Sequence, residues 1–512
     1  MTFLEERDLE DVPNIQDYYK RKTIFMTGGS GFMGKVLIEK LLYSCTDLDR
    51  IYLLLRSKKG LKPEERLAQL YSSQCFDRLR KEKPGVFESK VYFIAGDVNE
   101  IGLGITDEDR TLIVNRTHII FHVAASVRFD EPLKVAAQLN LRGTKEVIEL
   151  AKDVRNLEVL IHVSTGYSNT NRNPIEEVMY PPHADWRKTL QICEELDDHT
   201  LKVLTPKYLG ELPNTYVFTK QLAEHVVYEH KGKLPIVIVR PSIVISSHLE
   251  PQPGWIENFN GPVGMFIACG KGILRTIHSS PDIVSDYIPV DIAIKACIAA
   301  SWIRGTKKLE STDDIPIYNI CAGDLNNMSV NEILKLGKDF VLTIPLKDML
   351  WTYGGTLTTS LFMFNLKVLF QHVLPAIFVD LILWILGKKP MLVKIQRRIY
   401  VANIALRYYL TQQWTFCNKN FIALRSKIKK ADQPAFYYEI ENVDKTEFFR
   451  QAAIAGRKIL LKEKDEDLPK ARAHYKRLVI LEKILQFIFY GLLIWWLINT
   501  EYFKNTVKTL GY

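Results

Sequence analysis

Tyr216 and Lys220 are spaced as a proton donor and a cation that acts on it. On a helix, residues four apart share one face, so the ammonium would lie near the phenol. A nearby cation favours the phenolate and lowers the phenol pKa. A tyrosine tuned in this way can give a proton to a carbonyl oxygen as hydride arrives, or take one in the reverse direction. A solvated pair on a helix surface is the alternative interpretation.

Two hydroxyl side chains, Ser164 and Thr165, directly follow the apolar run Val159–Val163. We expect that run to be a parallel strand, and hydroxyls at the carboxyl end of such a strand face the ligand crevice. Either one could donate a hydrogen bond to the same substrate oxygen and stabilise developing negative charge. The choice between the two stays open, and a turn at the strand end is the alternative role.

A glycine-rich turn near the N-terminus has the pattern of a dinucleotide site. Gly28, Gly31 and Gly34 follow a short apolar run and precede an amphipathic stretch, 35–43, which indicates strand, tight turn and helix. The glycines allow the turn, the approach of a pyrophosphate and close packing of the helix. The pyrophosphate would bind the free N–H groups at the helix start. This spacing is typical of extended short-chain dehydrogenases/reductases, and an ordinary turn is the alternative.

Arg56, which follows the second expected strand, predicts NADPH as the cofactor. NAD sites usually have Asp or Glu here for the ribose 2′-hydroxyl, whereas Arg suits a 2′-phosphate; a generic basic loop is the alternative. Asp97 is expected near the adenine ring and Lys220 near the nicotinamide ribose. The residues predicted to contact the cofactor are Thr27, Gly28, Ser30, Gly31, Phe32, Met33, Gly34, Arg56, Asp97, Val98, Ala124, Ala125, Ser126, Asn140, Lys220 and Pro241.

Short apolar runs alternate with helical patterns through the first half of the chain. The expected strands are 23–27, 51–55, 91–95, 118–123, 159–163 and 235–240. Helices between them imply right-handed crossovers and an α/β fold, a Rossmann-type doubly wound parallel sheet. The predicted domains are an N-terminal segment (1–22), a Rossmann reductase domain (23–345) with a substrate-pocket segment (250–345), a helical C-terminal domain (346–470) and a transmembrane or anchor helix (478–499).

Composition limits the class of protein. The 512 residues are 47% hydrophobic and 25% charged, which permits a packed core. The net charge of +9 is spread along the chain, which favours a membrane surface or an anionic substrate over nucleic acid. Seven cysteines without a Cys-x-x-Cys pair indicate a reducing compartment. No His, Cys and Asp cluster has metal-ligand spacing, so we expect no metal.

Two apolar stretches in the C-terminal third indicate contact with membrane lipid. The first, 373–386, contains Asp380 and falls short of the roughly 20 residues that a span needs. We expect a buried or an interfacial, partly embedded helix there rather than a span. The second, 478–499, has an uncharged core, with Trp495 and Trp496 near its end as in an interfacial aromatic belt. A soluble C-terminal helix is the alternative for the second stretch.

Charges around the second stretch predict its orientation. Four basic residues precede it, and Lys504 and Lys508 follow it in the short tail. The positive-inside bias then leaves the body of the protein in the cytosol. A cytosol-facing protein with such an anchor fits the endoplasmic reticulum, the peroxisome and the lipid droplet.

The chain resembles the alcohol-forming fatty acyl-CoA reductases, and the insect members most closely. The resemblance covers nearly the whole chain, and the region 360–460 is similar to the family's C-terminal male-sterility domain. It rests on the segments TGGSGFMGKVLIEKLL (27–42), IYLLLRSKKG (51–60), FHVAASVRF (121–129), HVSTGYSN (162–169), PNTYVFTKQLAE (213–224) and VRPSIV (239–244).

The resemblance implies the reaction and its residues. A long- or very-long-chain acyl-CoA would be reduced by two NADPH to a primary fatty alcohol and CoA, with catalysis by Tyr216 and Lys220 and a hydroxyl from Ser164 or Thr165. The alternatives are a related reductase that releases the aldehyde or acts on a sterol or a nucleotide sugar, and a binding protein that has lost catalysis. The chain length of the substrate, the organelle and the oligomeric state, a homo-oligomer included, stay open.

Overall fold

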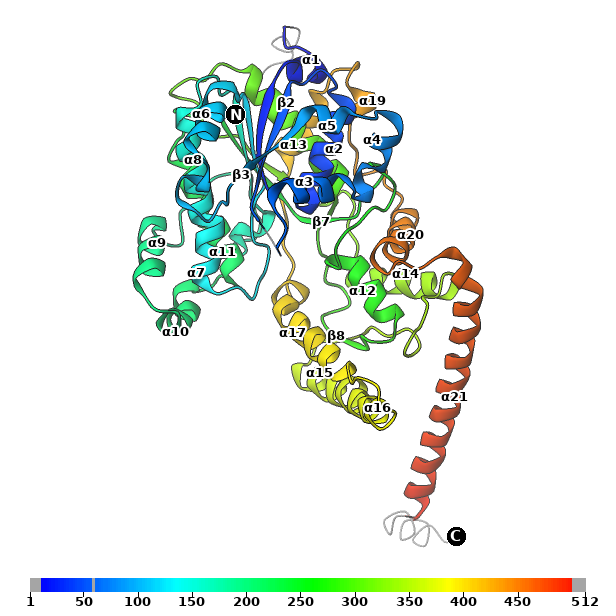
Figure 1. Ribbon diagram of the computed structural model, residues 1–512. Helices are drawn as coiled ribbons and strands as arrows, with labels where there is room; N and C mark the ends of the chain where they lie inside the picture. The colour runs from blue at the N-terminus through cyan, green and yellow to red at the C-terminus, as the bar shows by residue number, and fades with distance from the viewer. Residues whose placement is uncertain (1–10, 58–59, 500–512) are drawn as a thin grey trace.

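A seven-stranded parallel sheet forms the centre of the computed structural model, which describes residues 11–57 and 60–499 (Figure 1). The first ten residues of the predicted N-terminal segment, and Lys504 and Lys508, lie outside the described residues. The strand order is β10-β6-β5-β4-β1-β2-β3. The strands are β1 Thr23–Thr27, β2 Arg50–Leu55, β3 Val91–Ala95, β4 Ile119–His122, β5 Val159–Val163, β6 Ile236–Pro241 and β10 Ile317–Ile320.

This order is that of a doubly wound Rossmann sheet, so the predicted fold class is confirmed. All six predicted strands are present, with bounds that differ by no more than one residue. From β1 the chain adds β2 and β3 on one side of the sheet, and then β4, β5 and β6 on the other side. The order of the strands therefore reverses between β1 and β4, although these two strands are parallel neighbours. At such a switch point, the crevice outside the carboxyl ends of the strands is the place where ligands bind.

The seventh strand, β10, lies in the segment that we expected only to shape the pocket. It is four residues long and pairs with β6, where Ile317 lies opposite Ile238. Helix α13 (Val290–Thr306), from the same segment, is buried along nearly its whole length and contacts β5 and β6. Residues 250–345 therefore also complete the sheet and cover one of its faces.

Helices cover both faces of the sheet. On one face, α2 (Phe32–Ser44) packs against α13 in a core that includes Leu37, Leu41 and Trp302. On the other face, the core contains side chains of α8 and α11, shown on the left in Figure 1. Besides α2 and α13, the helices of the two faces and of the strand connections are α1 Ile15–Tyr19, α3 Pro63–Tyr71, α4 Asp77–Glu82, α5 Val86–Lys90, α6 Asp107–Arg116, α7 Leu133–Ala136, α8 Gly143–Asp153, α9 Trp186–Glu195, α10 Asp198–Leu209 and α11 Thr215–Tyr228.

The C-terminal half is mostly helical, as predicted. Its elements are α12 Gly261–Gly270, α14 Val330–Thr343, α15 Leu361–Val368, α16 Leu374–Ile385, α17 Leu392–Leu410, α18 Lys419–Ser426, α19 Gln433–Phe436, α20 Lys445–Ala455 and α21 Leu468–Asn499, with the short paired strands β7 Ile243–Ile245 and β9 Tyr287–Pro289, and β8 Thr276–His278 and β11 Thr356–Thr358. Phe421 of α18 and Phe436 of α19 belong to the same core as α13. The boundary at residue 346 stays a prediction.

Two described helices are long and apolar enough to cross a membrane. One joins α15, a π-helical turn (Leu369–Val373) and α16 into 25 residues, and the other ends with α21. For 373–386 we expected a buried helix or an interfacial, partly embedded one. The buried alternative is wrong, because this helix is longer and its apolar side chains are largely exposed, whereas the interfacial alternative stays a prediction. The predicted stretch began too late, since the polar residues Asn365, Lys367, Gln371 and His372 interrupt the apolar run before residue 373.

Candidate active site

A cavity of about 1450 Å³ lies at the carboxyl ends of the strands, at the switch point of the sheet. The volume exceeds the roughly 300–1,000 Å³ of common small-ligand sites, so it can hold a dinucleotide and a second ligand together. Most predicted site residues line it. They are Gly28, Ser30, Gly31, Phe32, Met33, Gly34, Arg56, Asp97, Val98, Ala124, Ala125, Ser164, Thr165, Tyr216, Lys220 and Pro241.

Three predicted cofactor residues, Thr27, Ser126 and Asn140, are not among the lining residues. Asn140 is buried and holds the backbone of Ser126 through two hydrogen bonds, with Oδ1 2.8 Å from Ser126 N and Nδ2 3.2 Å from Ser126 O. The Thr27 hydroxyl lies 2.7 Å from Nδ1 of His122. Burial and the cation of Lys220 lower the pKa of His122 to about 3, so this imidazole is neutral. Thr27 and Asn140 therefore support the residues of the cavity wall without lining the cavity themselves.

The glycine turn has the backbone that a pyrophosphate site requires. Gly28 has φ +76°, a conformation that favours glycine, and a Cβ there would lie 2.5 Å from Ala124 N. A Cβ at Gly34 would lie 2.3 Å from Gly28 O, so this glycine lets α2 begin against the turn itself. The free N–H groups at the start of α2 therefore face the cavity without side chains in between, which suits an anion.

Two arginines meet at the end of β2. Arg56 Nη1 donates to Asp97 Oδ2 at 2.9 Å, and Arg66 Nη2 donates to Ser30 Oγ at 3.1 Å. Arg66 also donates to the Arg56 carbonyl, so the two guanidiniums are neighbours, and burial together with Arg56 lowers the pKa of Arg66. A phosphate between them would relieve this repulsion. Arg66 was not predicted, because it follows a ten-residue gap within an ordinary polar helix.

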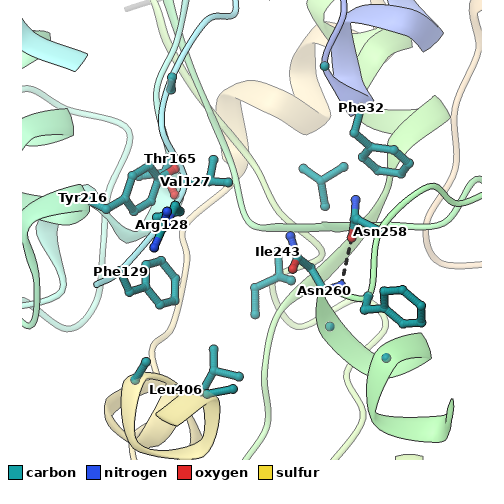
Figure 2. Close-up of a pocket in the computed structure, with 18 of the residues that line it drawn as sticks. Phe32, Val127, Arg128, Phe129, Thr165, Tyr216, Ile243, Asn258, Asn260 and Leu406 are labelled. Carbon is teal, nitrogen blue, oxygen red and sulfur yellow. Dashed lines mark hydrogen bonds between the residues drawn. The ribbon is translucent and has the colours of Figure 1, made fainter. Parts of the chain in front are cut away.

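Tyr216 is held at the start of α11 by the cap of that helix. The Asn214 side chain accepts from Val217 N at 3.0 Å and fixes the first turn. The phenol faces the Thr165 hydroxyl, and the two lie together on one wall of the cavity in Figure 2. Burial raises the pKa of Tyr216 to about 12, and the hydrogen bond from Thr165 offsets only part of that rise. The phenol therefore keeps its proton at neutral pH.

The effect of Lys220 on the phenol differs from the prediction. Lys220 Nζ donates to Val163 O at 2.6 Å, and the ammonium does not lower the pKa of Tyr216. The lysine is buried, which lowers its own pKa to about 8, although the carboxylate of Glu224 partly opposes this shift. A lysine with this pKa loses its charge near neutral pH more readily than a surface lysine.

Ser164 and Thr165 have different surroundings. Ser164 Oγ donates to Glu224 Oε1 at 2.5 Å. Glu224 is itself in a buried ion pair with Arg240, in which Nε and Nη2 donate at 2.9 and 2.7 Å. Thr165 instead faces the phenol of Tyr216. Sequence spacing could not separate the two hydroxyls, because the partner of Ser164 lies 60 residues further along the chain.

The far end of the cavity is lined partly by the predicted substrate-pocket segment, 250–345, and partly by a helix that the sequence did not single out, α17. The lining parts are the start of α12, the loop before it and the inner face of α17. Figure 2 shows Asn258 and Asn260 across the cavity from Tyr216, with Leu406 of α17 at its lower end. Tyr409, also on α17, accepts from Asn214 Nδ2 at 2.9 Å, so α17 is bonded directly to the cap of the helix that carries Tyr216.

Known proteins share the fold and large parts of the sequence of this chain. A family model for an NAD-binding domain, described as male sterility protein, matches residues 26–297, and a second model with the same description matches residues 371–463. The reductase domain of a nonribosomal peptide synthetase from Mycobacterium tuberculosis superimposes with a TM-score of 0.58 at 18% identity, covering 90% of this chain and 96% of that one. The terminal reductase domain of the myxalamid pathway gives 0.55 at 17%, covering 85% and 90%. These two structures support the fold.

The curated sequence relatives are about twice as identical to this chain as those two structures. Fatty acyl-CoA reductase 1 of Rattus norvegicus is 39% identical over 466 residues, which is 91% of this chain and 90% of the rat protein. Fatty acyl-CoA reductase wat of Drosophila melanogaster is 36% identical over 488 residues, 95% and 93% of the two chains. The Rossmann domain is of the type that binds a nicotinamide cofactor. The chain is an oxidoreductase and belongs to the fatty acyl-CoA reductase family.

Proposed function

We propose that this protein uses NADPH to reduce a long- or very-long-chain fatty acyl-CoA to a primary fatty alcohol and CoA. The observation that carries the proposal is the Tyr216 and Thr165 hydroxyl pair at the wall of a cavity that continues to apolar side chains of α12 and α17. A thioester carbonyl at the pair would leave its acyl chain directed along those helices. The names of the relatives support the same substrate class.

The residues have distinct roles in this proposal. The bound nicotinamide supplies hydride to the carbonyl carbon. Tyr216, protonated at neutral pH because its pKa is about 12, donates a proton to the carbonyl oxygen, and Thr165 donates a hydrogen bond to the same oxygen. Loss of CoA thiol from the resulting hemithioacetal gives an aldehyde. A second hydride and a second proton at the same site convert the aldehyde to the alcohol.

In the proposal, Lys220 binds the cofactor and Ser164 positions the strand end, and neither gives a proton to the substrate. We propose that the Lys220 ammonium leaves the Val163 carbonyl for the ribose hydroxyls when the cofactor binds. Ser164, bonded to the buried Glu224, sets the position of the strand end that carries Thr165. Ser164 is thus proposed as a positioning residue, and Thr165 as the hydroxyl that touches the substrate.

Product analysis tests the reaction. Membranes that contain the protein should convert NADPH and acyl-CoA of graded chain length to fatty alcohol, with about two NADPH oxidised for each alcohol formed. Fatty aldehyde as the only product would support the one-step alternative. Consumption of a sterol or nucleotide sugar with no turnover of any acyl-CoA would refute the assignment. Membranes that carry the Tyr216→Phe variant provide the blank.

We predict that Arg56 and Arg66 together select NADPH over NADH. Arg56→Ala removes charge-assisted bonds to the 2′-phosphate, worth roughly 1.5–3 kcal/mol. The ratio of kcat/KM for NADPH over NADH should fall at least about tenfold in this variant, and further when Arg66→Ala is added. Arg110→Ala, in an exposed pair on α6, is the matched control and should leave the ratio unchanged. An unaltered ratio in the double variant would show that another group reads the cofactor.

We also propose that α21 anchors the protein with its body in the cytosol, at the endoplasmic reticulum, the peroxisome or the lipid droplet. Residues 480–498 of the helix expose their large apolar side chains, and no residue from Ile484 to Ile498 is charged. The N-terminal part of the helix packs on the body, where Glu482 accepts from Thr352 Oγ1 at 2.8 Å and from Trp351 Nε1 at 3.2 Å. The anchor therefore starts close after Glu482.

A further inference from the structure

The helix that runs from Leu361 to Ile385 buries His372 and Asp380 and leaves most of its large apolar side chains exposed. Its buried side chains recur every fourth residue and form one narrow stripe: Phe364, Val368, His372, Ala376 and Asp380. Around the rest of the circumference, fifteen large apolar side chains between residues 361 and 386 are exposed. Helices at the surface of a soluble protein show the reverse pattern.

Specific hydrogen bonds fix this orientation. The Asp380 carboxylate accepts from the first three N–H groups at the start of α17, from Met391, Leu392 and Val393, each at 2.9 Å. His372 Nε2 accepts from Arg275 N at 3.0 Å on the body of the protein. Rotation of the helix to hide its apolar face would leave these buried polar groups without partners.

We propose that the hairpin made of α15, α16 and α17 inserts its outer face into the cytosolic leaflet of an anionic lipid membrane, as a contact separate from the α21 anchor. The exposed face matches the acyl region in chemistry. The hairpin lies on the side of the molecule toward which α21 extends, seen in the lower part of Figure 1. An anchor that leaves the body on that side brings the hairpin to the same surface.

Charge at the hairpin favours a lipid surface over a second copy of this chain. Lys388 and Lys389 lie at the turn between α16 and α17. Lys394, Arg397 and Arg398 follow within the first two turns of α17, exposed and also among the residues that line the cavity. Two copies that met at this face would bring the like charges together. Anionic headgroups attract such clusters, and long basic side chains near the interface can extend to the headgroups while the adjacent helix is embedded.

The contact would place the cavity at the lipid surface. Helix α17 packs along α16, and its other side lines the cavity with Val401 and Leu406. Its last turn reaches the catalytic helix, since Tyr409 is bonded to the cap residue Asn214. If the proposed function holds, an acyl chain in the cavity would meet the membrane along α17, so the lipid product need not cross water.

Trp384 gives a direct readout, because it is 68% exposed on the proposed membrane face. The Trp495→Phe and Trp496→Phe substitutions remove the tryptophan fluorescence of α21. The full-length chain that carries both is reconstituted into phosphatidylcholine and phosphatidylserine vesicles, with or without acyl-brominated lipid. Brominated lipid should quench part of the tryptophan emission. Trp384→Phe should abolish most of that quenching, whereas Trp186→Phe on α9 should leave it unchanged.

Binding without the anchor is the second measurement. A chain that ends at Lys483 keeps the contacts of Glu482, and we expect it to float with anionic vesicles. Phe378→Asp, Leu381→Asp and Ile385→Asp together should lower the floated fraction at least about tenfold, because each carboxylate is costly in the acyl region. Ile101→Asp, Val178→Asp and Val203→Asp alter exposed apolar residues elsewhere and form the matched control.

Either of two results would overturn the proposal. One is equal quenching of the parent and Trp384→Phe by brominated lipid. The other is protection of Trp384 from acrylamide that grows with protein concentration and not with lipid, which would show that a second copy covers the face. Neither measurement uses turnover, so the failure of the acyl-CoA assignment would leave them interpretable.

Discussion

Tyr216→Phe should lower the rate of NADPH-dependent acyl-CoA reduction by about 10²–10⁴-fold, the usual contribution of a positioned proton donor. The change removes one oxygen from a half-buried ring in the cavity and leaves the ring packed beside Phe129, whose centroid lies 5.8 Å away. Cofactor affinity should stay within about threefold, because the glycine turn and the arginines hold the dinucleotide. Single-turnover oxidation of NADPH and cofactor fluorescence titration measure the two quantities separately.

A second tyrosine supplies the control for this experiment. Tyr208→Phe on α10 also removes one phenol hydroxyl, which lies 2.9 Å from Thr189 Oγ1 and outside the residues that line the cavity. Its turnover should match that of the parent protein. If folded Tyr216→Phe protein retains full activity, the proton must come from another group and the assignment of Tyr216 fails.

The sequence predicted six of the seven strands of the sheet, because all of these but the edge strand β3 are buried on both faces and read as nearly uninterrupted apolar runs. Val159–Val163 is buried at every position and coincides with the predicted strand. The missed strand Ile317–Ile320 has a polar Asn319 among its four residues, and its amide is bonded within the fold to two backbone carbonyls. A short run that includes a buried polar side chain gives no period from sequence alone.

The parts of the site that were harder to predict depend on contacts between distant segments. The different surroundings of Ser164 and Thr165 depend on Glu224 and Arg240, whose pairing has no local signature. For the helix that carries Trp384 the sequence left a buried and an interfacial position open, since hydropathy does not say which side of a helix meets the protein. Asp380 looked like an interruption of that helix and is in fact the cap of the next one.

Glu224→Ala should destabilise the Rossmann domain by about 3–5 kcal/mol, the usual cost of leaving one partner of a buried ion pair alone. Arg240 and Glu224 are 0% and 1% exposed, and the carboxylate also accepts from the Ser164 hydroxyl. Its loss therefore removes the shared acceptor of the Arg240 guanidinium and of two buried hydroxyls, those of Ser164 and Ser168. We expect the thermal unfolding midpoint in detergent to fall by roughly 5–10 °C, measured by scanning fluorimetry.

Two further variants separate the ion pair from general damage to the helix. Glu229→Ala, at the C-cap directly after α11, breaks the exposed pair with Arg187 and should cost no more than about 1 kcal/mol. Glu224→Met combined with Arg240→Met removes both charges, and because no charge is left alone it should be more stable than Glu224→Ala. A double variant as unstable as Glu224→Ala would mean that the hydroxyls of Ser164 and Ser168, and not the unpaired guanidinium, account for most of the lost stability.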